Sequence, residues 1–214
     1  MTISTQDKRR RFRALHESGL LVLPNPWDIG GDKRLERLGA QAIASSSAAF
    51  AWSNGLEDFE VGRDALLAHL RHLAASTTLP LNADFENGFA DEPKQVAENV
   101  RLAIDTGIAG LSIEDRQGNE LYELDLAVAR IQAAKQAICS SGEDVLLVGR
   151  SEGMLIGALD LEQTIARLQA FAQAGADVVY APRFTRAGRY CPRSSGTGTD
   201  TRECAADSSG AERA

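Results

Sequence analysis

The sequence predicts an α/β fold, a (β/α) TIM-type barrel, from three observations. Short, continuously apolar segments alternate six times with segments of helical periodicity, a pattern typical of a parallel sheet that is buried on both faces. Acidic, serine and arginine residues follow the predicted strands, at the ends where parallel α/β folds carry their active sites. No glycine-rich nucleotide loop follows the first apolar segment, which argues against a dinucleotide-binding sheet and for a barrel.

The length of 214 residues fits a single domain at the small end of the barrel range. The predicted strands are short apolar runs, at residues 20–23, 42–46, 79–84, 110–114, 145–150 and 177–181. The predicted helices follow from periodic apolar residues, from glycines that end them and from a first-turn proline at position 93. They span residues 5–18, 32–38, 63–76, 93–106, 125–139 and 161–174.

The apolar pattern stops after the sixth predicted strand. Residues 183–214 contain no Leu, Ile, Val, Met or Trp, so they cannot bury enough apolar surface to offset the entropy of ordering them. We expect a barrel domain over 1–182 and a disordered, aberrant tail over 183–214. The barrel would lack its last two strands, so that a partner chain closes it or strand edges stay exposed. A shifted reading frame or an altered C-terminus is one hypothesis for the abrupt change, and resequencing the coding region tests it.

The composition excludes several classes of function. A formal net charge of −7 argues against nucleic-acid and anionic-membrane partners, which require a concentrated basic face. Three cysteines without paired spacing give neither a zinc site nor a disulfide framework. The sequence also lacks an apolar run long enough to cross a membrane and a signal-peptide core at its start. We therefore expect a cytoplasmic protein.

Two predicted strands end in acids. Asp84 and Glu86 lie two residues apart at the end of the third strand, so their side chains are expected on one side, where they could hold a divalent cation. Glu114 ends the next strand. A solvated acidic loop would also explain such a pair. His69 and His72 lie three residues apart on a predicted helix, and we expect them to face solvent because neighbouring leucines occupy the buried face of that helix.

The motifs at the strand ends resemble the phosphoenolpyruvate mutase/isocitrate lyase superfamily, in its phosphonomutase-like branch, over residues 10–182. They are Pro-Asn-Pro-Trp-Asp at 24–28, Ser-Ser-Ser at 45–47, Asp-Phe-Glu-Asn-Gly-Phe at 84–89, Ser-Ile-Glu-Asp-Arg at 112–116 and Gly-Arg-Ser-Glu at 149–152. The resemblance implies a barrel, dependence on Mg²⁺ with Mn²⁺ as a substitute, a small 2-oxo carboxylate substrate, and a homo-oligomer, dimer or tetramer.

The resemblance also implies roles for individual residues. It assigns the metal to Asp84, Glu86 and Glu114 and the substrate carboxylate to Trp27, Ser46, Ser47 and Arg150, with Asp58 and Arg150 as catalytic residues. The physical chemistry of these residue types agrees, because Arg150 can meet a carboxylate with two parallel hydrogen bonds and a divalent cation stabilises an enolate.

Each assignment has a plainer alternative. Trp27 could pack in the core, and Ser46 and Ser47 could simply fit a crowded strand end. Asp58 lies in an acidic loop that could be solvated, and Arg150 could be only an ion-pair partner of a neighbouring glutamate.

One loop departs from the superfamily pattern. Isocitrate and methylisocitrate lyases carry a Lys-Lys-Cys-Gly-His loop after the fourth strand, whereas residues 116–121 read Arg-Gln-Gly-Asn-Glu-Leu and hold neither that thiol nor the mutases' lysine. This argues against isocitrate cleavage and phosphonate chemistry. The leading hypothesis is a Mg²⁺-dependent lyase or phosphonomutase-like enzyme that makes or breaks a C–C or P–C bond through an enolate. The alternative is a catalytically silent, truncated barrel that only binds or assembles.

Overall fold

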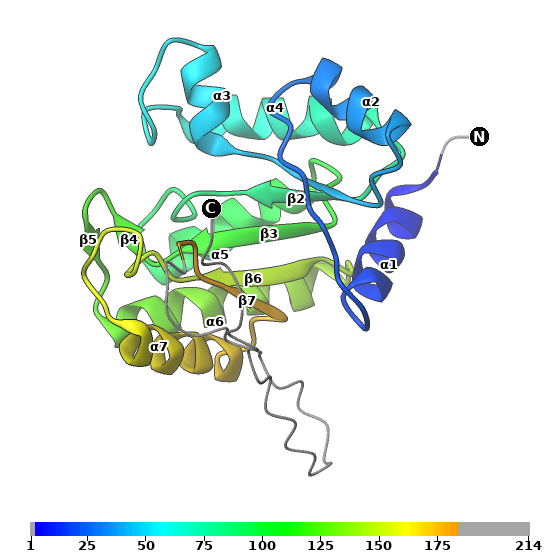
Figure 1. Cartoon of the computed structure of the whole chain (residues 1–214). Coiled ribbons are helices and arrows are strands. Elements are labelled where there is room, and N and C mark those ends of the chain that lie inside the picture. The colour runs from blue at the N-terminus through cyan, green and yellow to red at the C-terminus, as the bar shows by residue number, and fades with distance from the viewer. Residues whose placement is uncertain (1–2, 184–214) are drawn as a thin grey trace, which may run out of the picture. The chain divides into compact units, whose positions relative to one another are not determined.

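A curled, fully parallel sheet organises the part of the chain that the computed structural model describes, residues 3–183 (Figure 1). Its strand order, β1-β2-β3-β6-β7, is the order of the strands along the chain. The strands are β1 (Ile43–Ala44), β2 (Leu81–Asp84), β3 (Gly110–Glu114), β6 (Leu146–Arg150) and β7 (Val178–Tyr180). A sheet wound in one direction without a reversal of strand order is typical of a barrel, and it confirms the predicted fold class.

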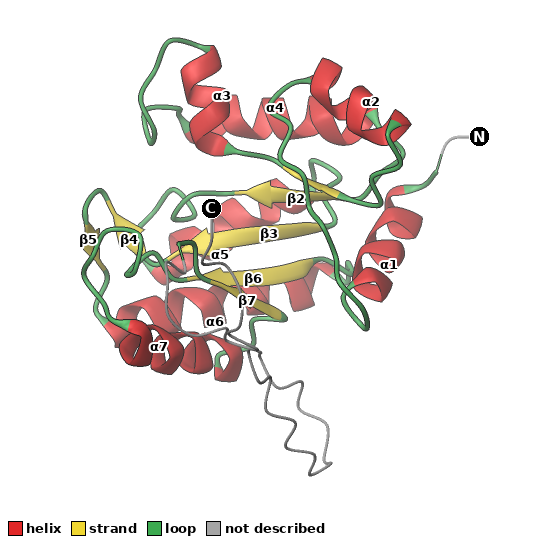
Figure 2. Cartoon of the chain, viewed as in Figure 1, coloured by secondary structure: helices red, strands yellow, loops and turns green. Residues whose placement is uncertain are grey.

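Seven helices accompany the strands within residues 3–183 (Figure 2). They are α1 (Thr5–Leu15), α2 (Ile29–Arg37), α3 (Ser47–Ser53), α4 (Arg63–Ser76), α5 (Pro93–Ile104), α6 (Leu124–Ser141) and α7 (Leu161–Gln173). Helices α4 to α7 pack against the outer face of the sheet, where they bury one continuous hydrophobic core. The predicted helices at 63–76, 93–106, 125–139 and 161–174 are confirmed to within about two residues.

Side chains of the strands alternate between this core and the inner face of the sheet. On β3, Leu111 and Ile113 belong to the core, whereas Ser112 and Glu114 line a cavity on the inner face. Register continues the alternation across the sheet, because Ser112 lies opposite Asp84 of β2 and Glu114 opposite Arg150 of β6. The polar residues at the strand ends therefore share one face and one rim.

Helix α1 closes the amino-terminal end of the strands. Phe12 is fully buried and packs with Ala109 and Leu146 in a second, smaller core cluster. Lys8 and Arg9 are also buried, and Arg9 donates hydrogen bonds to the carbonyls of Ile104 and Ile108 at 2.8 and 2.9 Å. The helix is thus tied to the sheet by both apolar and polar contacts.

The strand predicted at 20–23 is wrong. This segment is a loop (Figure 2), in which Leu20 is 91% and Val22 is 68% exposed while Leu21 and Leu23 pack on the small cluster around Phe12. A short apolar run does not by itself distinguish a buried strand from a loop that packs on one side.

Three elements lie outside the sequence prediction. Helix α3 begins at Ser47, where the Ser46 side chain accepts a hydrogen bond from the amide of Ala49 at 3.2 Å. Strands β4 (Arg116–Gln117) and β5 (Glu120–Leu121) form an antiparallel hairpin with Gly118 at a φ of 57°. A left-handed backbone at this turn suits glycine.

Helices α3 and α4 meet through an aromatic stack. The rings of Phe50 and His69 lie 3.7 Å apart between centroids at an interplanar angle of 8°. His69 is only partly exposed, and its Nε2 is buried without a hydrogen-bond partner among the described residues. The expectation that His69 faces solvent is therefore wrong, whereas His72 is exposed as expected.

The predicted tail at 183–214 lies outside the described residues, except for Arg183, so its predicted disorder stays a prediction. Within residues 3–183, no helix combines the length and the apolar character needed to span a membrane.

Candidate active site

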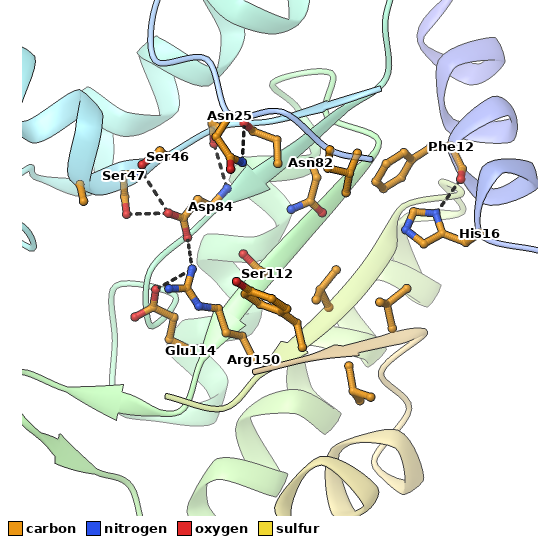
Figure 3. Close-up of a pocket in the computed structure, with 18 of the residues that line it drawn as sticks. Phe12, His16, Asn25, Ser46, Ser47, Asn82, Asp84, Ser112, Glu114 and Arg150 are labelled. Carbon is orange, nitrogen blue, oxygen red and sulfur yellow. Dashed lines mark hydrogen bonds and ion pairs between the residues drawn. The ribbon is translucent and has the colours of Figure 1, made fainter. Parts of the chain in front are cut away.

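A cavity of about 470 Å³ runs along the inner face of the sheet, from Phe12 of α1 to the charged residues at the carboxyl ends of the strands (Figure 3). Its lining includes most of the predicted site residues, namely Ser46, Ser47, Asp58, Asp84, Glu114 and Arg150. The parallel strands β2, β3 and β6 each contribute one charged side chain to the same rim. The structure thus brings together residues that are up to about a hundred positions apart in the sequence.

Asp84 occupies the centre of the rim, between Ser47 and Arg150 (Figure 3). Its Oδ2 accepts hydrogen bonds from the amide and the hydroxyl of Ser47 at 3.0 and 2.9 Å. Its Oδ1 accepts from Nη1 of Arg150 at 3.2 Å, and its own amide donates to Oγ of Ser45 at 2.9 Å. Ser47 therefore orients Asp84.

The guanidinium group of Arg150 joins two of the acids. Its Nη1 lies 3.2 Å from Oδ1 of Asp84 and 3.2 Å from Oε1 of Glu114. Burial alone would lower the pKa of Arg150, but the charges of Glu114, Asp84 and Glu152 outweigh it and raise that pKa. The arginine is therefore both an ion-pair partner of these acids and a part of the cavity wall.

Glu114 and Glu86 are buried acids with raised pKa values. Glu114 is 3% exposed, and burial raises its pKa to about 8 despite the opposing charge of Arg150. Burial, followed by repulsion from Asp58, Asp84 and Glu114, raises the pKa of Glu86 to about 8 as well. The amide of Glu114 donates to the carbonyl of Glu86 at 2.8 Å, so the backbones that carry these two acids lie side by side.

Glu86 is displaced from the cavity wall by the shape of its loop. It is 3% exposed, has a left-handed φ of 47° and is not among the cavity-lining residues. The buried Arg130 of α6 donates to the carbonyls of Ala90 and Asp91 at 2.5 and 3.1 Å and to that of Asn87. This arginine fixes the loop that carries Glu86.

Asp58 reaches the site from the loop between α3 and α4. Burial raises its pKa, the charge of Arg116 opposes this, and the charge of Asp84 adds to the rise. Nη2 of Arg116 lies 3.5 Å from Oδ2 of Asp58, and the same guanidinium group lies 4.5 Å from the ring centroid of Phe59. The hairpin β4–β5 therefore contacts the loop of Asp58 across the mouth of the site.

Arg116 and Glu152 are site residues to which the sequence analysis gave no function. Nε of Arg116 lies 3.4 Å from Oε2 of Glu114 and 3.3 Å from Oε2 of Glu152. Oε1 of Glu152 accepts from Nε of Arg150 at 2.5 Å. The spacing of Arg150 and Glu152, two residues apart at a strand end, repeats that of Asp84 and Glu86 and could have indicated a shared site.

Two predicted substrate contacts remain predictions. Trp27 is 48% exposed and lies outside the residues that line the cavity. Ser46 lines the cavity, but its hydroxyl already accepts the capping hydrogen bond of α3.

The chemistry of the donor set fits a divalent cation, although residues 3–183 contain no group of three His, Cys, Asp or Glu side chains already arranged as ligands. Five carboxylates gather around two guanidinium groups at this site. The carboxylates belong to Asp58, Asp84, Glu86, Glu114 and Glu152, and the guanidinium groups belong to Arg116 and Arg150. When all are ionised, three negative charges are in excess. Oε2 of Glu114 is buried without a hydrogen-bond partner among the described residues. Carboxylate oxygens are the ligands that Mg²⁺ prefers.

Comparison with known proteins places the chain in a family. Residues 12–189 match the family described as phosphoenolpyruvate phosphomutase. The 2-methylisocitrate lyase of Escherichia coli strain K12 is 31% identical over 205 residues, which cover 88% of this chain and 66% of that protein.

Solved structures show the same fold. A Burkholderia cenocepacia J2315 protein, provisionally described as a lyase/mutase, is 44% identical with a TM-score of 0.80 over 83% of this chain and 65% of that chain. Oxaloacetate acetylhydrolase is 26% identical with a TM-score of 0.77 over 83% of this chain and 64% of that chain. The chain spans slightly less than two thirds of the length of such relatives.

Proposed function

The chain belongs to the phosphoenolpyruvate phosphomutase family, and on that premise we propose that it is a Mg²⁺-dependent lyase or mutase of a small 2-oxo carboxylic acid. It would make or break a C–C or P–C bond through an enolate intermediate, and the absence of the mutases' lysine from residues 116–121 favours the C–C bond. Members of the family are lyases and mutases of small carboxylic acids. The observation that carries the proposal is the convergence of three strand ends, in which one nitrogen of Arg150 contacts both Asp84 and Glu114.

Asp84, Glu86 and Glu114 would hold the cation, and Mn²⁺ could replace Mg²⁺ because both prefer oxygen ligands. When bound, such a cation withdraws charge from a developing enolate oxygen. Ser47 supports this role, because its two hydrogen bonds to one oxygen of Asp84 fix the orientation of that carboxylate.

Arg150 would bind the carboxylate of the substrate from the cavity wall, with a charge-assisted hydrogen bond. Asp58 would hold or accept the proton at the reacting carbon, since its raised pKa suits a general acid–base residue better than that of a solvated aspartate. Trp27 and Ser46 would complete the substrate site.

The hairpin at 116–121 favours substrates that need no cysteine acid. Its strands hold Arg116, Gln117, Glu120 and Leu121, and none of these side chains carries a thiol. We therefore place the substrate among 2-oxo acids that are cleaved without an isocitrate-type proton donor from this loop.

The test uses the complete chain and the variant Asp84→Ala. Mg²⁺ is expected to raise the melting temperature of the unaltered protein, and oxalate, a small dicarboxylate probe, should raise it further. A screen of 2-oxo and 2-hydroxy acids with Mg²⁺, read by pyruvate release, should identify a substrate. Asp84→Ala should abolish the Mg²⁺ shift and the turnover.

The matched control is Asp64→Ala, because Asp64 is an acid on α4 whose side chain is 81% exposed. It should behave like the unaltered protein. If neither Mg²⁺ nor oxalate changes the melting curve and no acid is turned over, the proposal is wrong and the catalytically silent barrel takes its place.

A further inference from the structure

We propose that Glu152 is a positioning residue that fixes both arginines of the site, so that Arg150 meets its substrate carboxylate through Nη2. The inference rests on the proposed function for the nature of the ligand. It concerns a residue whose side chain lines no part of the cavity and therefore would not touch the substrate itself.

Glu152 is placed between the two guanidinium groups and is fully buried, with 0% exposure. Its Oε1 accepts from Nε of Arg150 at 2.5 Å, and its Oε2 lies 3.3 Å from Nε of Arg116. One carboxylate thus contacts the end of β6 and the hairpin β4–β5 at the same time.

The backbone of Glu152 is also held in place by a hydrogen bond. Its amide donates to Oδ1 of Asp115 at 2.8 Å, and Oδ2 of Asp115 accepts from Nε of Arg167 on α7 at 2.5 Å. All three side chains are buried. The carboxylate therefore has a fixed position from which it can orient its partners.

The hydrogen bonds of Arg150 determine which of its nitrogens remains available. Nε is bound to Glu152, and Nη1 contacts Asp84 and Glu114. Nη2 has no hydrogen-bond partner among the residues that the structure describes, and the side chain lines the cavity. Without moving, Arg150 can therefore offer a ligand the two N–H groups of Nη2, rather than a parallel pair from Nε and Nη2.

The variant Glu152→Gln separates positioning from packing, because Gln has nearly the same shape. Its carbonyl oxygen could still accept from Arg150, but its amide N–H groups would then face Nε of Arg116, a donor against a donor. The neutral side chain keeps the hydrogen bond to Arg150 but loses the ion pair with Arg116, whose Nε has no hydrogen-bond partner among the described residues. Glu152→Asp keeps the charge but shortens the side chain by one methylene group.

The experiment measures oxalate binding by calorimetry in the presence of saturating Mg²⁺, for the complete chain and for each variant. Glu152→Gln should weaken oxalate binding by about 10- to 100-fold, the range typical of mutating the hydrogen-bond partner of a metal ligand, applied here to the partner of Arg150. Glu152→Asp should recover part of this loss. The Mg²⁺-induced shift of the melting temperature should persist in both variants, because Asp84, Glu86 and Glu114 are unchanged.

The matched control is Glu162→Gln, since Glu162 is exposed on α7, and it should bind oxalate like the unaltered chain. A second measurement applies even if Glu152→Gln folds poorly. Added guanidinium ion should restore oxalate binding to Arg150→Ala, and should restore it less when Glu152→Asp is combined with it.

The outcomes separate the two proposals. If the unaltered chain binds oxalate and Glu152→Gln binds it equally well, the positioning role is overturned while the proposed function stands. If the unaltered chain binds neither Mg²⁺ nor oxalate, the proposed function is wrong and this inference falls with it. Equal restoration of the single and the double variant by guanidinium ion would also overturn the role of Glu152.

Discussion

The ring of Phe12 occupies the space that a side chain on Gly110 would need. A Cβ atom at Gly110 would lie 2.6 Å from Cε1 of Phe12 and 2.7 Å from Oδ1 of Asn82. Helix α1 therefore packs directly on the backbone of β3, the strand that ends in Glu114. Gly110→Ala should lower the free energy of unfolding by about 1 to 3 kcal/mol, because overpacking forces neighbours to shift. Urea unfolding measures the change.

The control for this substitution is Gly30→Ala on α2. A Cβ there meets only Oδ1 of Asp28, at 3.4 Å, so alanine should be neutral or stabilise the helix by up to about 1 kcal/mol. Equal stability of both variants would show that Phe12 adjusts without cost.

Ser47→Ala should weaken Mg²⁺ binding without unfolding the protein. The hydroxyl donates one of the two hydrogen bonds that Ser47 makes to Oδ2 of Asp84, and the amide bond at 3.0 Å remains. Loss of such an orienting contact typically lowers metal affinity about 10-fold or more. Titration of Mg²⁺ followed by the melting temperature measures the affinity. Ser53→Ala, at the exposed end of the same helix, is the control, and an unchanged affinity in Ser47→Ala would contradict the orienting role.

Arg130→Met should destabilise the loop that carries Glu86. Arg130 is 1% exposed, donates to three loop carbonyls and lies 3.9 Å from the ring centroid of Tyr122. Methionine fills similar space but leaves those carbonyls without a donor, at a total cost of about 2 to 5 kcal/mol. Urea unfolding checks this. Arg101→Met, on an exposed position of α5, should change stability by less than about 0.5 kcal/mol.

The sequence predicted the barrel-type fold and the rim because both depend on local patterns. Continuous apolar runs identified β2, β3 and β6, and parallel register brings their last residues, Asp84, Glu114 and Arg150, to one rim. The apolar run at 20–23 was wrongly predicted as a strand. Apolar residues alone do not show whether a neighbouring backbone pairs with the segment and buries it. Helix α3 was missed although Ser46 is a good capping residue, since seven residues give little periodicity.

The connections within the site could not be predicted in the same way. That Glu152 lies between two arginines depends on how the hairpin β4–β5 folds back over β6, a tertiary contact that no spacing encodes. The hairpin itself had a signal, a Gly-Asn pair between short strands. Exposure of Trp27 likewise depends on packing around the loop before α2.

His69 should make stability fall as the pH drops below neutral. Burial, followed by the charge of His72, lowers the pKa of His69 to about 4 in the folded protein, whereas a histidine in an unfolded chain has a pKa of about 6.5. Between these pH values the unfolded state binds a proton that the folded state does not. The contribution of the neutral ring is thus complete above about pH 6.5 and is lost as the pH falls toward 4.

His69→Phe keeps a ring that can stack on Phe50 but removes the titration, so its free energy of unfolding should fall less between pH 7 and pH 5 than that of the unaltered protein. Urea unfolding at several pH values compares them, with Ala68→Ser, on an exposed position of the same helix, expected to follow the unaltered protein. Parallel pH profiles for His69→Phe and the unaltered protein would show that the stacked ring is not protonated preferentially on unfolding.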